Sequence, residues 1–371
     1  MISQRAAAFA VIVAFVAGLL ASLALRPPGS ATDPVQRSPS TADTVQLRAR
    51  WRVPSAFPTA TPIIGETPVW LAQRLREATR GALVLDVYDP GELVPAFSLV
   101  DAVRDGKVEA GYTWLGYDQG KIPASVLFAA TPFGMEPWEY LGWWFEGGGR
   151  ELADEIYAGY GIKPLLCGII GPETAGWFRA PVEDLDDLRG LKIRMSGIGG
   201  KVLERAGASV TTLPAGEIFQ ALEKGAIDAT EFSQPAIDEA LGFDRVARHN
   251  YFPGWHQTFT ASHVVIGQPY WDGLSAADQA LVEMACDAVT TQTLATGEAR
   301  QGPAMQRFAA KGVEAHYLDR DILEALREYT REQMQLEADR DADFARVYAS
   351  QTAYRLVYRQ WKEMGYLPRD F

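Results

Sequence analysis

Three charged side chains could carry the chemistry of this chain: Arg194, Glu231 and Glu173. Arg194 ends a stretch in which apolar and basic residues alternate, so we expect it at the end of a strand, just before a Gly-rich turn. A guanidinium there could hold a carboxylate through two parallel hydrogen bonds. Glu231 ends a second predicted strand, and Glu173 follows a third. Each of the three could equally be an exposed polar residue at a strand end or in a loop.

Aromatic residues are abundant near the same strand ends. Most of the chain's ten Trp side chains belong to its core, but one or two near strand ends could form a wall of a ligand pocket. The candidates for such a wall are Trp114, Tyr117, Trp177, Phe232 and Trp255.

Two segments 119 residues apart suggest how these residues are positioned. Residues 102–110 and 221–229 both read as the end of a helix, a Gly and a hydrophobic strand that carries an acid. Ligands of open α/β sheets bind beyond the carboxyl ends of the strands. We therefore predict an α/β, bilobed fold, with two α/β domains that face each other across a cleft. A chance repeat within an ordinary α/β protein is the alternative.

The predicted elements set the domain limits. Strands alternate with helices, which indicates parallel sheets, and the strand predicted at residues 258–267 returns the chain to the first block. We expect lobe I at residues 46–170 plus 258–275 and lobe II at residues 171–257 plus part of 276–317. Hinge crossings join the two lobes, and C-terminal helices follow at residues 318–371.

The first 45 residues predict export. A basic start and an apolar run at residues 6–25 make residues 1–25 a signal peptide or an N-terminal anchor, and the Pro-, Ser- and Thr-rich residues 26–45 a disordered linker. The folded part then lies in the periplasm. The net charge of −12 argues against nucleic acid or an anionic membrane as partner.

The Cys and His residues indicate no further site. Cys167 and Cys286 lie in apolar patterns, which favours two buried free thiols over a disulfide. His249, His256 and His263 are spaced by seven residues in a strand-and-loop region, so we expect no two of them to lie close enough to bind a metal ion. No motif of a zinc protease or of a serine hydrolase occurs.

Longer motifs resemble a known family. The chain carries LRGLKIR at residues 188–194, GGKVL at 199–203 and LPAGEIFQALEKGAIDATE at 213–231. These resemble the DctP-type solute-binding receptors of TRAP (tripartite ATP-independent periplasmic) transporters. GPETAGWFR at 171–179 and YFPGWH at 251–256 resemble the branch that binds 2-oxo acids and related monocarboxylates. The resemblance covers about residues 50–317.

The resemblance implies a bilobed periplasmic-binding-protein-like fold of type II. It also implies a receptor, not an enzyme, that delivers a small organic acid to the membrane permease subunits of a TRAP transporter. The family's carboxylate-clamping arginine falls on Arg194. A cation joins the ligand in this branch, held by a Gln, a Glu and the Trp position that follows the Glu. Those positions are Glu173, Glu231 and Phe232 here, so the chain departs from the pattern at two of the three. Some branch members pair through a C-terminal helix, which implies a possible homodimer.

The departure at Glu173 changes the expected cation. A monocarboxylate, Arg194, Glu231 and Glu173 sum to a charge of −2, and burying uncompensated charge is costly. Ca²⁺ would restore neutrality and prefers oxygen ligands, so we expect Ca²⁺ rather than Na⁺, with no other cofactor. Protonation of Glu173, or a substrate that carries a cationic group, would serve as well.

Two other functions fit the same residues. The protein could feed a sensor rather than a permease, or it could be a secreted hydrolase that uses Glu173 and Glu231 as its acid and base. The paired carboxylates are the one feature that favours the hydrolase.

Overall fold

Strands of three sheets form the framework of the protein. The computed structural model describes residues 46–367, so the predicted leader and linker lie outside the described residues. A two-stranded sheet pairs β1 (Ala49–Pro54) with β2 (Leu83–Tyr88), and a three-stranded sheet has the order β3 (Ala110–Thr113), β10 (Thr260–Gly267), β4 (Ile162–Ile170). A six-stranded sheet has the order β11 (Glu314–Tyr317), β9 (His249–Phe252), β5 (Gly176–Phe178), β8 (Ala229–Thr230), β6 (Lys192–Arg194), β7 (Ser209–Thr211).

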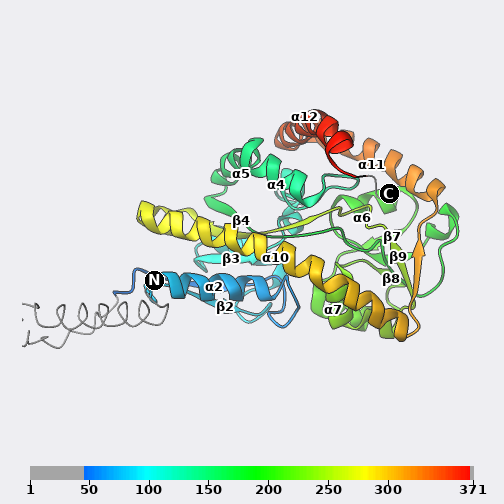
Figure 1. The fold of residues 1–371 in the computed structure, drawn as a ribbon, viewed down its shortest axis with the longest axis horizontal. Helices are drawn as coiled ribbons and strands as arrows, with labels where there is room; N and C mark the ends of the chain where they lie inside the picture. Colours follow the sequence, from blue (N-terminus) through cyan, green and yellow to red (C-terminus); the bar gives the residue numbers. More distant parts are fainter. Residues whose placement is uncertain (1–45, 368–371) are drawn as a thin grey trace, which may run out of the picture. The chain divides into compact units, whose positions relative to one another are not determined.

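Helices cover these sheets (Figure 1). The α-helices are α2 (Glu66–Ala78), α3 (Leu99–Arg104), α4 (Pro137–Glu146), α5 (Gly149–Ala158), α6 (Gly197–Arg205), α7 (Ala215–Glu223), α8 (Pro235–Leu241), α9 (Gln268–Asp272), α10 (Ala276–Ala310), α11 (Arg320–Arg340) and α12 (Ala342–Gly365). Short 3₁₀ turns are η1 (Ala96–Ser98), η2 (Leu115–Asp118), η3 (Pro123–Phe128), η4 (Leu185–Leu188) and η5 (Phe243–Arg245). None of the helices within residues 46–367 combines the length and the apolar character that a bilayer span needs.

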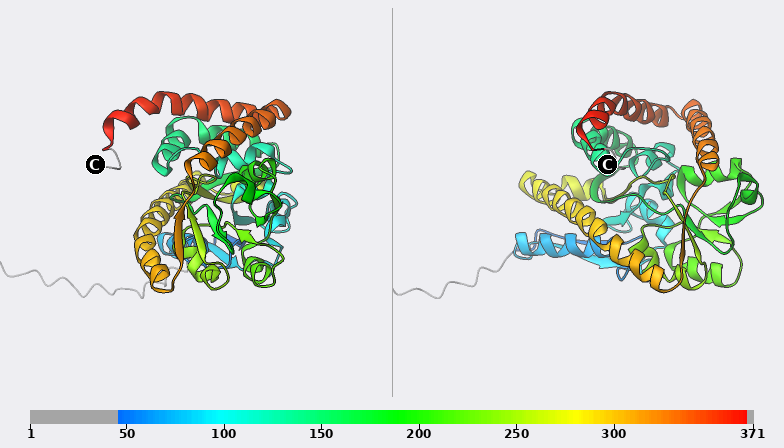
Figure 2. Two further views of the ribbon diagram at one scale, coloured as in Figure 1. Left: turned by 90° about the vertical axis from the view of Figure 1, so that its right-hand side faces the viewer. Right: turned by 45° about the vertical axis from the view of Figure 1, so that its right-hand side comes forward.

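The chain passes between the three-stranded and the six-stranded sheets more than once. It leaves β4 for β5, returns in β10 as predicted, and leaves again along α10, which packs on both β4 and α8. Helix α10 continues through Pro303. Figures 1 and 2 show this helix running past both groups of strands.

The prediction of purely parallel sheets was wrong at these crossings. β10 runs antiparallel to β3 and β4, and β5 runs antiparallel to β8 and β9. Antiparallel neighbours need no crossover helix, whereas parallel neighbours do. The αβ units themselves are parallel, as predicted: β1 pairs with β2, and β6 pairs with β7 and β8.

Cys167 and Cys286 form a disulfide, so the prediction of two free thiols was wrong. Cys167 lies in β4 and Cys286 in α10, and both are buried. The packing of α10 on β4 brings them together, although 119 residues separate them. Disulfides form in oxidising compartments, which agrees with the predicted export.

Removing this disulfide should destabilise the fold. We expect the double substitution Cys167→Ser and Cys286→Ser to lower the free energy of unfolding by about 2–5 kcal/mol, because a long loop in the unfolded chain is no longer closed. Urea unfolding followed by circular dichroism measures this. Reduced wild-type protein should match the double variant, and an unfolding midpoint of the wild type that does not respond to reductant would contradict the bond.

Candidate functional site

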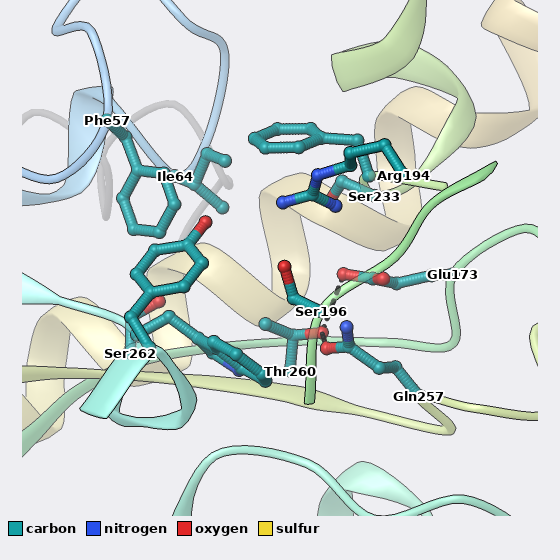
Figure 3. Close-up of a pocket in the computed structure, with 12 residues that line it drawn as sticks. Phe57, Ile64, Glu173, Arg194, Ser196, Ser233, Gln257, Thr260 and Ser262 are labelled. Atoms are coloured by element: carbon teal, nitrogen blue, oxygen red, sulfur yellow. Dashed lines mark hydrogen bonds between the residues drawn. The ribbon is translucent and has the colours of Figure 1, made fainter. Parts of the chain in front are cut away.

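A small cavity lies where the two larger sheets meet the crossing segments. It encloses no more than about 350 Å³ of empty space. Figure 3 shows its twelve lining residues. They are Phe57, Ile64, Trp114, Tyr117, Glu173, Arg194, Ser196, Phe232, Ser233, Gln257, Thr260 and Ser262. The lining residues therefore come from β6 and β10 themselves, from the segments that follow β1, β3, β4, β6 and β8, and from the segment that leads into β10.

Arg194 supplies the positive charge of this cavity. It ends β6, its side chain is only 2% exposed, and Figure 3 shows the guanidinium pointing into the cavity. Nε donates to the carbonyl of Leu213 at 3.2 Å, and Nη1 donates to the carbonyl of Glu231 at 2.8 Å. The Phe232 ring lies 5.3 Å from the guanidinium carbon, which favours the cation. The side chain is thus held in one orientation before any ligand arrives.

Glu231 is the ion-pair partner of Arg194. The parallel register pairs Arg194 with Thr230, the last residue of β8, so Glu231, which follows directly, places its side chain beside the arginine. Glu231 Oε1 accepts from Arg194 Nη1 at 2.7 Å and from the backbone N–H of Ser196 at 2.9 Å. Its side chain is fully buried. The carboxyl ends of two neighbouring strands therefore create this buried pair.

Glu173 and His256 complete the charged cluster. Glu173 Oε1 accepts from the Thr260 hydroxyl at 2.7 Å. His256 Nε2 lies 3.3 Å from Glu231 Oε2 and 3.5 Å from Glu173 Oε2, and all three side chains are buried. The two loops approach closely because residue 254 is a Gly: a Cβ there would lie 2.2 Å from the carbonyl oxygen of Glu173.

The electrostatics of the cluster follow from burial and pairing. Burial raises the pKa of Glu173, and hydrogen bonds with His256 and Thr260 only partly offset it. Burial alone would raise the pKa of Glu231 too, but Arg194 and His256 outweigh it and lower the pKa. Burial would lower the pKa of His256, yet the two carboxylates raise it to about 9. The cluster therefore sets two basic side chains, Arg194 and His256, against two carboxyl groups, those of Glu173 and Glu231.

Several polar atoms in the cavity lack hydrogen-bond partners. Among the residues that the structure describes, the buried atoms Trp114 Nε1, Glu173 Oε2, Ser196 Oγ and Ser233 Oγ have none. All four residues line the cavity. Buried polar groups are rarely left unpaired, so the arrangement suits a small polar guest that supplies both donors and acceptors.

The oxygen-rich side of the cavity could also hold a metal ion. Ligand atoms of Glu173, Glu231 and His256 lie within 4.8 Å of one another. Glu173 Oε2 accepts no hydrogen bond within the normal range and lies 3.5 Å from the His256 ring, so a cation would satisfy it. These residues therefore fit a bound cation.

The structure brings most of the predicted site residues together, but two lie elsewhere. Arg194, Glu173, Phe232, Trp114 and Tyr117 line the cavity, and Glu231 lies directly behind Arg194.

Trp177 and Trp255 do not line this cavity. Trp177 is in the core, donates from Nε1 to Asp238 at 2.8 Å and packs on Phe308. Trp255 packs against Phe133 and lines a separate groove beside α11 and α12. A strand-end position alone does not fix the direction in which a Trp side chain points.

His256 is the main residue that sequence reasoning missed. We considered it only together with His249 and His263, and the structure separates those three as expected. His263 is buried in β10, and His249 lies near His316. The two acidic residues at strand ends gave no indication that a His would lie between them, because the loop after β9 brings it there.

Comparisons with known proteins agree with this geometry. Residues 55–340 match the family described as "Bacterial extracellular solute-binding protein, family 7" (DctP). A relative from Nostoc sp., a monocarboxylate 2-oxoacid-binding periplasmic protein, is 33% identical over 320 residues, which cover 86% of this chain and 87% of the relative.

Two solved structures of TRAP solute-binding proteins have the same fold. One, from Bordetella bronchiseptica, is a dimer with copurified calcium and picolinate, with a TM-score of 0.83 and 30% identity over 85% of this chain and 94% of its own. The other, from Pseudoalteromonas atlantica, has bound sodium and pyruvate, with a TM-score of 0.82 and 28% identity over 86% and 96%. The chain therefore belongs to family 7 of the bacterial extracellular solute-binding proteins, the receptors of TRAP transporters.

Proposed function

We propose that this receptor binds a small 2-oxo or 2-hydroxy monocarboxylate in the cavity at Arg194 and delivers it to a TRAP permease. The observation that carries the proposal is the buried guanidinium of Arg194, which points into a small cavity whose other walls hold unpaired polar atoms. Receptors of this family act outside the cytoplasm as carriers, which supports a binding role rather than a catalytic one for Glu173 and Glu231.

The carboxylate of the ligand would meet Arg194 on the side of the six-stranded sheet. Trp114 and Tyr117 face it from the segment after β3, and Tyr117 packs on Trp114 with ring centres 5.1 Å apart. Burial raises the pKa of Tyr117 to about 12, so its hydroxyl stays a donor. We propose that lobe I, residues 46–170 plus 258–275, closes on lobe II, residues 171–257 plus part of 276–317, and that binding shifts the population toward the closed form.

Arg194 should dominate the affinity. We expect Arg194→Ala to weaken binding of pyruvate and related acids by roughly 30-fold or more, because a desolvated carboxylate loses its charged partner. Arg194→Lys keeps the charge but not the two-pronged geometry, and should fall between the alanine variant and the wild type. Titration calorimetry over a panel of 2-oxo, 2-hydroxy and dicarboxylic acids measures this.

Arg189→Ala is the matched control for that experiment, since Arg189 is exposed and pairs with Asp186. It should bind as the wild type does. Thermal melting checks that each variant is folded. Wild-type affinity in folded Arg194→Ala protein would remove Arg194 from the site.

A bound Ca²⁺ is the second part of the proposal. Glu173 and Glu231 would hold the ion with help from His256, and the ion would tie the ligand's remaining oxygen atoms to the protein. An ion bound at His256 would displace the proton that this imidazole carries at neutral pH. The charges of the ligand, Arg194 and the two carboxylates would then sum to −2, which a divalent ion neutralises. Phe232 lines the same cavity, and its expected part in holding the ion remains a prediction.

Chelation tests the cation. We expect EDTA or EGTA treatment to abolish most of the pyruvate binding and added Ca²⁺ to restore it. Glu173→Gln lowers the negative charge of the cluster by one, so Na⁺ should then suffice. Calorimetry in Ca²⁺ and in Na⁺ buffers distinguishes these cases. Full affinity after chelation would mean that the His256 imidazolium, and not a metal ion, neutralises the carboxylates.

We also propose a homodimer through α12. Its exposed residues Val357, Trp361 and Met364 are spaced by four and three residues and so lie on one face of the helix. Figure 2 shows the end of α12 projecting beyond its neighbours. A protein with an apolar helix face of this kind commonly buries it against a partner, and the Bordetella structure is a dimer.

Charges on this face should prevent the dimer. We expect the wild type to be a dimer and the double variant Val357→Glu with Met364→Glu to be a folded monomer, because the interface would bury two carboxylates of each protomer. Size-exclusion chromatography with light scattering measures this. Met284→Glu, at an exposed Met of α10, is the control and should stay dimeric. A monomeric wild type would contradict the proposal.

A further inference from the structure

Two of the four His residues of the chain meet at the edge of the six-stranded sheet, together with an acid. His249 Nδ1 lies 3.1 Å from His316 Nε2 and 3.5 Å from Glu314 Oε2, and His316 Nε2 lies 3.7 Å from the same oxygen. None of these three residues lines the ligand cavity. The ligand-binding function therefore leaves this cluster unexplained.

The strand register places the three side chains on one face. β11 runs parallel to β9, with Glu314 paired to His249 and His316 two residues further along β11. Side chains two residues apart share a face of a strand, so Glu314 and His316 both flank His249. The His316 ring also stacks on Tyr251 at 4.7 Å, and the Tyr251 hydroxyl is fixed by the backbone of Val182. Regular structure, rather than a mobile loop, thus holds the cluster.

The distances match the face of a tetrahedral metal site. Zinc binds His nitrogen and carboxylate oxygen at about 2.0–2.2 Å, so neighbouring ligand atoms of a tetrahedral site lie about 3.3–3.6 Å apart. The three observed separations, 3.1, 3.5 and 3.7 Å, bracket that range. One side chain is largely buried and the other two are open to water, with side-chain exposures of 14% for His249, 30% for His316 and 62% for Glu314. An ion can therefore reach the cluster and keep a water molecule as its fourth ligand.

We propose that His249, His316 and Glu314 form a second metal site, for a transition-metal dication such as Zn²⁺. Two imidazole nitrogens and one carboxylate suit Zn²⁺ and disfavour Ca²⁺, which prefers oxygen ligands. Without metal, one of the two imidazole rings donates a hydrogen bond to the other. For both nitrogens to bind the ion, the proton of that hydrogen bond moves to the outer nitrogen of its own ring, so two neutral imidazoles lose no proton overall.

The site would join two parts of the chain. β11 is the edge strand beside β9 and connects α10 with α11; it is the orange arrow in Figure 1. A metal ion held by both strands would fasten this connection to lobe II. Binding should therefore stabilise the fold and leave the affinity for the organic acid unchanged.

Zinc titration of the tag-free, EDTA-treated chain tests the site. We expect Zn²⁺ to raise the melting temperature by roughly 5 °C at saturating concentrations. Any shift that Ca²⁺ causes should be the same in the wild type and in His316→Gln. Co²⁺ should give the intense visible bands of a tetrahedral complex. His316→Gln should weaken Zn²⁺ binding by at least about 10-fold, measured by competition with a chromophoric chelator, and abolish these bands.

Two controls separate this site from the buried cluster. Glu173→Gln alters the cavity and should keep both the His316-dependent zinc affinity and the Co²⁺ bands. His316→Gln should keep wild-type binding of pyruvate. Zinc binding that is equal in the wild type, His249→Gln and His316→Gln, or the absence of any zinc-dependent melting shift in the wild type, would overturn the proposal.

Discussion

The buried pair of Arg194 and Glu231 is the constraint on which the rest of this site depends. Two charges removed from water are tolerated only when their geometry is nearly ideal, and losing one partner of such a pair costs roughly 3–5 kcal/mol. Adjacent parallel strands provide that geometry here, because β6 and β8 end side by side. Three hydrogen bonds hold the guanidinium to protein oxygens. The anion site is thus organised before the ligand arrives.

The other residues of the charged cluster lie on segments that run between the three-stranded and the six-stranded sheets. Glu173 follows β4 on the way to β5, and His256 and Thr260 lie on the way back from β9 to β10. A guest that contacts both Arg194 and Glu173 therefore links the six-stranded sheet to the crossing segments. In the proposed function, such a contact would let a small acid, with or without a cation, shift the equilibrium between open and closed arrangements of the two proposed lobes. The cluster at His249 lies at the edge of the six-stranded sheet, and none of its three residues lines the cavity.

Local sequence patterns predicted which residues lie at the ends of strands. They did not predict contacts between segments that are far apart in the sequence. The alternation before Arg194 and the helix-Gly-strand pattern before Glu231 predicted that each residue lies at the end of a strand. The structure adds that these two strands are neighbours, which brings the two side chains together. His256 and the Cys167–Cys286 bond were missed because each depends on a contact between remote segments that no local period records. The side-chain directions of Trp177 and Trp255 were missed for the same reason.

A crystal structure of the protein grown with pyruvate and calcium chloride tests the central claim most directly. The account predicts the carboxylate of pyruvate within hydrogen-bonding distance of the Arg194 guanidinium, inside the cavity of Figure 3, and a cation beside Glu173 and Glu231. Ligand density away from Arg194, or an Arg194 side chain that points into solvent while pyruvate is bound elsewhere, would contradict it.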